Sequence, residues 1–189
     1  DSAHSIGTVY DGKPTGCVAD MTTFSFHPVK TVTCGEGGAI TTNDEALYKR
    51  LLLFSKHGIT RDQSLMENEP DGPWYYEQLE LGYNYRITDI QCALGISQMN
   101  KLERFVDRRR ALVMRYQEAF KDIAGIVTPI EAEGCHSSWH LYVIRVEKRR
   151  EIFEALRALG IGVNVHYIPV YRHPYYQNHG YRSVVCPNA

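Results

Sequence analysis

The sequence predicts an α/β fold, because short strand-like stretches alternate with stretches of helical periodicity, and Gly and Pro mark the turns between them. The 189 residues are 43% hydrophobic and 23% charged, which is typical of a soluble globular protein and is enough to bury a real core. The formal net charge of -1 provides no field that would attract nucleic acid or an anionic membrane. We therefore expect neither of these as a partner.

The first part of the chain predicts three short strands and one helix. The strands are expected at residues 5–10, 21–26 and 39–42. The second of these is rich in Thr and Phe, and the glycine-rich residues 35–38 force a turn before the third. Asn43 or Asp44 can cap a helix over residues 45–55, where apolar side chains recur at helical spacing.

The rest of the chain predicts three helices and two strands. The helices are expected at residues 89–100, 101–121 and 147–159, and the strands at residues 140–146 and 162–168. Thr88 is a suitable N-cap for the first of these helices. The last strand, helix and strand predict a second, smaller α/β domain. Residues 57–79 show little periodicity and hold several Gly and Pro, so we expect a long functional or mobile loop there.

Several features of the sequence favour ordinary structural roles. The basic residues of the helix expected at 101–121 are interpreted as a solvated face spaced by Leu112 and Tyr116; they are Arg104, Arg108, Arg109, Arg110 and Arg115. The five cysteines are scattered without a CxxC pair, so we expect reduced thiols and neither a disulfide framework nor a zinc ribbon. His136 and His140 precede or enter a predicted strand and not a helix, so no metal site is expected. Neither a signal peptide nor an apolar run of about 18 residues is present.

Lys30 is the residue whose surroundings indicate covalent chemistry. It lies between an aromatic strand-like stretch and a glycine-rich turn, where backbone can approach a bound group closely. A lysine that forms imines must lose its proton, and partial desolvation favours the neutral amine. Asp1 and His4 add a carboxylate and an imidazole. These groups suit pyridoxal phosphate (PLP), in which a lysine forms the Schiff base and a carboxylate keeps the pyridine nitrogen protonated.

Several stretches resemble the sugar aminotransferases of the DegT/DnrJ/EryC1/StrS family. They read DSAH at residues 1–4, FSFHPVK at 24–30, GEGGA at 35–39, LGYNYRITD at 81–89, SWHLY at 138–142 and GVNVHYIP at 162–169. Any one of these motifs is weak, but together they cover nearly the whole chain in the family's order. The resemblance implies a fold-type-I, aspartate aminotransferase-like PLP-dependent transferase with a mostly parallel sheet. It also implies that the chain is a fragment, with part of the large domain in residues 1–105 and most of the small domain in residues 106–189.

The resemblance assigns the cofactor site to four residues of the first part of the chain. Lys30 would form the Schiff base and act as the general base and acid of the proton shift. Asp1 would pair with the pyridine nitrogen, although a solvated chain terminus is the alternative. His4 would lie beside the cofactor ring and Ser25 would bind the phosphate, whereas the alternatives are a packing histidine and a satisfied core hydroxyl.

Two further residues are implied at the edges of the site. Asn84 resembles the asparagine that reaches the phosphate of the neighbouring subunit's cofactor, which implies at least a homodimer with shared active sites. An Asn in a Gly-Tyr turn is otherwise a turn former. His166 lies in the stretch that approaches the substrate, and His140 is a weaker candidate that is also suited to packing.

The resemblance implies an enzyme of the bacterial cytoplasm that acts on a nucleotide-linked keto-sugar with L-glutamate as the amino donor. Residues 72–77 and residues 108–110 are most similar to the members that aminate the UDP-linked 4-keto-6-deoxy-N-acetyl hexose of pseudaminic acid synthesis, for surface or flagellar glycans. Two alternatives stay open. The fragment could be catalytically inactive and serve only as a dimerising or structural piece, or the enzyme could use a different nucleotide keto-sugar.

Overall fold

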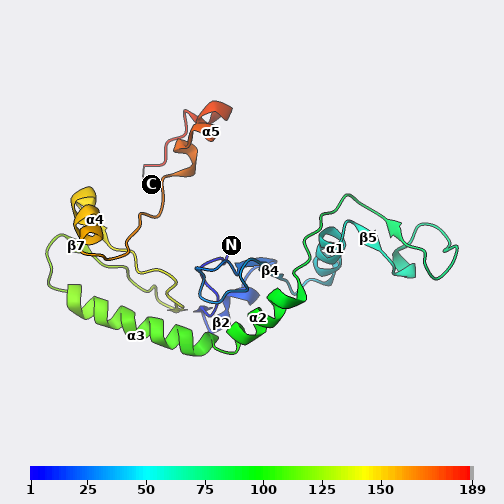
Figure 1. The fold of residues 1–189 in the computed structure, drawn as a ribbon, viewed down its shortest axis with the longest axis horizontal. Helices are drawn as coiled ribbons and strands as arrows, with labels where there is room; N and C mark the ends of the chain where they lie inside the picture. Colours follow the sequence, from blue (N-terminus) through cyan, green and yellow to red (C-terminus); the bar gives the residue numbers. More distant parts are fainter. Residues whose placement is uncertain (188–189) are drawn as a thin grey trace. The chain divides into compact units, whose positions relative to one another are not determined.

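The structure is a computed structural model that describes residues 1–187, and its chain divides into two compact units (Figure 1). The first unit comprises residues 1–124 and 128–144, and the second comprises residues 125–127 and the chain from residue 145 onward. The domain boundary expected near residue 105 falls inside a helix of the first unit, and for the complete protein it stays a prediction. None of the helices in the described part is long and apolar enough to cross a membrane.

The hairpin of β3 (Thr22–Ser25) and β4 (Gly38–Thr41) carries the predicted chemistry. The two strands pair antiparallel, from Thr22 opposite Thr41 to Ser25 opposite Gly38. The N–H of Ser2 donates to the carbonyl of Thr23 at 2.8 Å, so the chain's first residues run along β3. The hairpin therefore brings the DSAH motif and the lysine motif to one place.

Seven short strands make three other antiparallel sheets in the described residues. β1 (Val9–Tyr10) lies between β2 (Lys13–Pro14) and β8 (Cys135–His136), β5 (Ile59–Thr60) pairs with β6 (Glu77–Gln78), and β7 (Ile126–Val127) pairs with β9 (Arg145–Val146). None of the described pairs is parallel, so the mostly parallel sheet implied by the resemblance is not among them.

Three strand predictions were too long or wrong. Residues 5–10 form a strand only at β1, residues 140–146 only at β9, and residues 162–168 form no strand. A strand requires a hydrogen-bonded neighbour as well as an alternating pattern, and in the described part of the chain these segments have none over most of their length. Alternation alone therefore overstated the sheet content.

The four long helices confirm the periodicity within one or two residues. They are α1 (Glu45–Ser55), α2 (Asp89–Met99), α3 (Leu102–Phe120) and α4 (Arg149–Ala158), and Figure 1 labels each of them. Asp44 caps α1 by accepting from the N–H of Leu47 at 2.9 Å, and Thr88 begins α2 with a capping box to Gln91. Short one-turn helices follow at η1 (Thr15–Cys17), η2 (Gln63–Leu65), η3 (Val170–Arg172), α5 (Pro174–Tyr176) and η4 (Gln177–Tyr181).

Helix α3 contributes two buried apolar side chains to the first unit. Val106 and Val113 are buried, with 6% and 9% of their surface exposed, and lie two turns apart on one helix face. Burial of each stabilises the fold by about 1.5–3 kcal/mol. A Cβ added to Gly7 would meet a methyl group of Val106 at 2.8 Å, so only a glycine allows this close approach. This face of α3 thereby supports the segment that follows the DSAH motif.

Candidate active site

The loop between β3 and β4 holds Lys30 on a well-anchored backbone. The N–H of Phe26 donates to the Gly37 carbonyl at 2.8 Å, and the N–H of Cys34 donates to the Phe26 carbonyl at 3.1 Å. Val32 and Cys34 are buried at 1% and 2% exposure, whereas Lys30 is half-buried. In the described residues no carboxylate forms an ion pair with its ammonium group. The backbone is thus fixed while the amine is left for other contacts.

Ser25 stands at the end of β3 with a hydroxyl that can still donate. Its Oγ accepts from the N–H of His27 at 3.4 Å. A hydroxyl that accepts one hydrogen bond keeps its own proton for another acceptor, such as a phosphate oxygen. Ser25 and Lys30 therefore offer a donor and an amine on the same short loop.

A buried hydroxyl beside Lys30 points to a missing acceptor or donor. Thr31 is 6% exposed, and its Oγ1 has no hydrogen-bond partner among the residues that the structure describes. Such an atom is costly to bury alone, typically by about 1–3 kcal/mol. Its burial next to the lysine favours a site that is completed by a bound group or by further chain.

The structure places Asp1 and His4 beside the same hairpin. Asp1 is exposed, and its Oδ1 accepts from the N–H of Ala3 at 2.8 Å, which forms a tight turn. The ring of His4 lies against the ring of His140, with centroids 4.3 Å apart and planes at 48°. These two candidate histidines are 136 positions apart in the sequence, and the structure brings them together.

Helix α3 holds the segment around His140 through two arginines. Arg109 Nη1 donates to the carbonyls of Trp139 at 3.3 Å and His140 at 3.0 Å. Arg110 Nη1 donates to the Ser137 carbonyl at 2.9 Å. We call residues 137–140 the clamped segment. The interpretation as a solvated face is wrong for these two arginines, whereas Arg104, Arg108 and Arg115 are exposed.

Two features of the clamped segment show that it is tightly held. Trp139 has a backbone φ of +49°, a left-handed conformation that costs a non-glycine residue about 1–3 kcal/mol. Ser138 is completely buried, and its N–H donates to Thr8 Oγ1 at 3.0 Å. The surrounding contacts therefore over-determine the backbone that carries His140.

A bidentate ion pair completes the clamp. Arg110 donates to both carboxylate oxygens of Glu131, at 2.6 and 3.0 Å, and the N–H of Ser137 donates to the same carboxylate. The Arg110 guanidinium lowers the pKa of Glu131, and hydrogen bonding to Glu131 raises the pKa of Arg110. About a quarter of each side chain is exposed, so solvent screens this pair only partly.

The sequence carried a signal for these arginines. Arg109 and Arg110 each lie three or four residues from both Val106 and Val113, so they share the helix face that those valines bury. Arg108 falls outside that spacing. Helical phase, and not the basic composition of the run, distinguishes the clamp from the solvated residue.

Asn84 lies in a different part of the first unit, against the C-terminal end of α1. Its backbone bridges that of Lys56, and its Oδ1 accepts from Arg86 Nε at 3.1 Å. Among the described residues, no hydrogen bond joins Asn84 to the Lys30 loop. His166 is exposed and belongs to the second unit, where its ring lies edge-on to Tyr167 at 4.2 Å. The roles of both residues stay predictions.

The sequence pattern of the DegT/DnrJ/EryC1/StrS aminotransferase family matches residues 1–189. The chain belongs to this family. Solved structures of a Streptococcus pneumoniae protein assigned as a sugar aminotransferase, Spr1654, include a PLP form and a PMP form. The PLP form matches this chain with a TM-score of 0.84 and 36% identity, over 95% of this chain and 46% of that one. The expected family, its PLP dependence and the α/β transferase fold are confirmed.

Two other relatives carry more specific names. The UDP-4-amino-4,6-dideoxy-N-acetyl-beta-L-altrosamine transaminase of Campylobacter jejuni is 37% identical over 182 residues, which cover 94% of this chain and 46% of that protein. Helicobacter pylori PseC, an aminotransferase of pseudaminic acid biosynthesis, matches with a TM-score of 0.87 and 32% identity, over 100% of this chain and 50% of that one. The chain thus spans about half the length of the curated relatives that it matches.

The side chains around Lys30 fit the cofactor of this family. The β3–β4 hairpin offers an amine at Lys30 and a hydroxyl donor at Ser25, and the chain beside β3 offers the Asp1 carboxylate and the His4 ring. The unpartnered hydroxyl of Thr31 marks an incomplete polar environment at the same loop. A phosphate, a protonated ring nitrogen and an aldehyde would each meet a chemically suitable group here.

Proposed function

We propose that the complete protein is a PLP-dependent aminotransferase that moves an amino group from L-glutamate to the 4-keto carbon of a UDP-linked 4-keto-6-deoxy-N-acetyl hexose. The family match over the whole chain supports aminotransfer. The names of the C. jejuni and H. pylori relatives support the sugar class. The observation that carries the proposal is Lys30, a half-buried lysine without an ion-pair partner among the described residues, on a loop that also bears a hydroxyl donor.

Four residues of the first unit have a defined role at the cofactor in this proposal. Lys30 binds the cofactor covalently in the resting enzyme, and its Nζ removes and returns the proton of the reacting carbon. Asp1 holds a proton on the pyridine nitrogen, and Ser25 donates to the phosphate. His4 flanks the ring. When bound, PLP supplies the electron sink that stabilises negative charge at the reacting carbon.

The remaining predicted residues extend the site between subunits. Asn84 lies in the family motif at residues 81–89, and no hydrogen bond among the described residues joins it to the Lys30 loop of its own chain, so we propose that it contacts the cofactor of a neighbouring subunit. We propose a homodimer with shared sites for this reason. His166 would approach the sugar. The enzyme would supply amino sugars for bacterial surface or flagellar glycans from the cytoplasm.

The test is to add PLP, reduce with borohydride and map the modified peptide by mass, in this chain and in the complete protein. We expect a phosphopyridoxyl group on Lys30, its loss in Lys30→Ala, and its retention in Lys121→Ala, whose lysine pairs with Glu118 on the surface. A label in the complete protein alone would identify this chain as an inactive piece of an active enzyme. Absence of label in both would overturn the aminotransferase proposal.

The substrate part needs a separate assay on the complete protein. L-Glutamate and the UDP-linked 4-keto sugar should give 2-oxoglutarate and an amino sugar, which mass spectrometry distinguishes. Labelling of Lys30 without this product would keep the aminotransferase and reject the sugar. Other nucleotide keto-sugars would then be screened in the same assay.

A further inference from the structure

The turn that closes the Lys30 loop packs against helix α2. A Cβ added to Gly95 of α2 would lie 3.6 Å from the Cβ of Cys34, so the helix backbone lies against this buried side chain. A Cβ added to Gly37 would meet Ile87, which lies just before α2, at 3.2 Å. The loop and the first half of α2 are therefore in contact over several residues.

Gln91 supplies a polar contact between the same two segments. Its Nε2 donates to the Glu36 carbonyl at 2.7 Å, which joins residues 55 positions apart in the sequence. Its Oε1 accepts from the N–H and the hydroxyl of Thr88, at 3.0 and 2.9 Å, in the capping box of α2. A capping box requires only the acceptor, which Glu provides as well as Gln. The amide donor of Gln91 therefore serves the Lys30 loop and not the helix.

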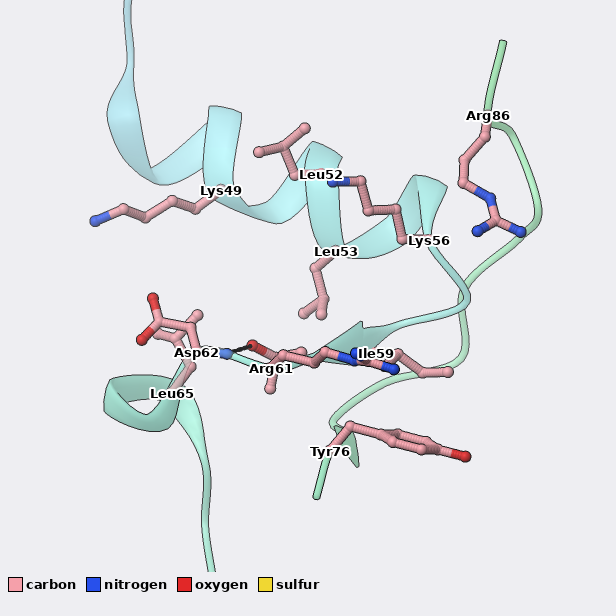
Figure 2. A pocket seen from close by; sticks show the side chains of 11 residues that line it. Lys49, Leu52, Leu53, Lys56, Ile59, Arg61, Asp62, Leu65, Tyr76 and Arg86 are labelled. Atoms are coloured by element: carbon pink, nitrogen blue, oxygen red, sulfur yellow. Dashed lines mark hydrogen bonds between the residues drawn. The ribbon is translucent and has the colours of Figure 1, made fainter. Parts of the chain in front are cut away.

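The chain that leads into α2 is held at its other end by α1. The backbone of Asn84 bridges that of Lys56 at the C-terminal end of α1, and the N–H of Tyr85 donates to the Ser55 carbonyl at 3.0 Å. Figure 2 shows Arg86 at this end of α1, where it lines the same groove as Lys56. The chain from Asn84 to the first turn of α2 therefore connects the end of α1 with the β3–β4 loop.

We propose that Gln91 is a positioning residue of the active site, which fixes the Lys30 loop relative to the segment that carries Asn84. The pairing of β3 and β4 already folds the hairpin, so a hydrogen bond at its turn fixes where the loop lies more than it stabilises the strands. A displacement of about 1 Å at a reacting group can lower a rate by about a hundredfold. This inference rests on the proposed function through the roles of Lys30 and Asn84.

The first measurement is hydrogen exchange of the complete protein without PLP. Gln91→Glu removes the donor and keeps the acceptor, so exchange over residues 26–37 should become about fivefold faster while the unfolding midpoint stays at the wild-type value. Gln91→Ala also removes the acceptor, so it should speed exchange equally and lower the midpoint as well. Gln98→Glu is the matched control, because it adds the same charge about 10 Å further along α2 and should leave exchange over residues 26–37 unchanged.

The second measurement distinguishes positioning from support of the fold. In the half-reaction with L-glutamate, Gln91→Glu should lower the rate constant about tenfold, and the half-saturating glutamate concentration should stay within about twofold. Misplacement of the Lys30 amine slows the chemical step itself. Partial unfolding would instead lower the amplitude of the reaction and leave its rate constant unchanged.

The outcomes separate this inference from the proposed function. Wild-type exchange over residues 26–37 in Gln91→Glu, or a wild-type rate constant, would overturn Gln91 as a positioning residue. Labelling of Lys30 in that case would leave the aminotransferase intact. Faster exchange in a protein whose Lys30 is never labelled would reject the proposed function and support the contact of Gln91 with the loop.

Discussion

The loop that carries Lys30 and the clamped segment that carries His140 are held in place by opposite means. Backbone hydrogen bonds across the β3–β4 hairpin fix the Lys30 loop. The side chains proposed to react or to bind the cofactor, Ser25 and Lys30, contribute little to its stability. The clamped segment has no sheet partner at residues 139 and 140, and the side chains of Arg109 and Arg110 satisfy its carbonyls instead. The first region is stabilised locally, the second by residues about thirty positions away in sequence.

Because of this difference, substitutions in the Lys30 loop should affect catalysis, and substitutions in the clamp should affect the stability of the fold. In the hairpin, removal of a reactive side chain should change the folding free energy little, because the backbone hydrogen bonds between β3 and β4 remain. In the clamped segment, removal of an arginine leaves partly buried carbonyls without their donors, which lowers the stability of the fold directly. Substitutions in the two regions should therefore move different observables.

The largest expected effect is on chemistry. Lys30→Ala in the complete protein should lower aminotransferase activity by at least about a thousandfold, because in the proposed function its amine both binds the cofactor and moves the proton. The unfolding midpoint measured without PLP should stay close to the wild-type value. A large fall in that midpoint would show that Lys30 also holds the loop, and would remove the contrast between the regions.

The backbone pairing of β3 and β4 should be destabilised by a single added methyl group. A Cβ added to Gly38 would lie 2.7 Å from the carbonyl oxygen of Phe24, and backbone cannot move aside without loss of pairing. We expect Gly38→Ala to destabilise the fold by about 1–3 kcal/mol in urea unfolding. Ala39→Ser, at the next residue of β4, is the control. Gly35 is not suitable as a control position because its φ of +86° would itself strain a side chain. Equal stability of both variants would contradict the close packing.

The clamp is tested by two neighbouring arginines. Arg109→Ala should cost about 2 kcal/mol, since it leaves the carbonyls of Trp139 and His140 without their charged donor. Arg108→Ala removes the same charge from the exposed face and should change stability by less than about 0.5 kcal/mol. Chemical denaturation of both variants gives the comparison. Similar losses of stability in the two variants would mean that Arg109, like Arg108, belongs to a solvated helix face.

The smallest effect is a pH dependence of the Arg110–Glu131 pair. The folded state lowers the pKa of Glu131, so its contribution is present above the unfolded pKa of about 4.3 and is lost as pH falls through the folded pKa. Glu131→Gln should be less stable than wild type by about 1 kcal/mol at neutral pH. The two proteins should converge on acidification. A difference that stays constant down to acidic pH would argue against the ion pair.

Local signals predicted most helices and the lysine loop well. Asp44 and Thr88 cap their helices as expected, because capping requires only residues within one turn. The turn of glycines after Lys30 likewise follows from nearby sequence. Strands at residues 140–146 and 162–168 were overpredicted, since strand formation depends on a distant neighbour that no local pattern specifies.

The sequence by itself determined the helices, the family-like order of motifs and Lys30 as the candidate for covalent chemistry, because residue type and short spacing carry that information. Only the tertiary structure decided that His4 meets His140 and that Arg109 and Arg110 clamp residues 137–140. These contacts join residues far apart in sequence. They depend on how α3 packs, and burial and long-range hydrogen bonds fix that packing, whereas local sequence patterns do not.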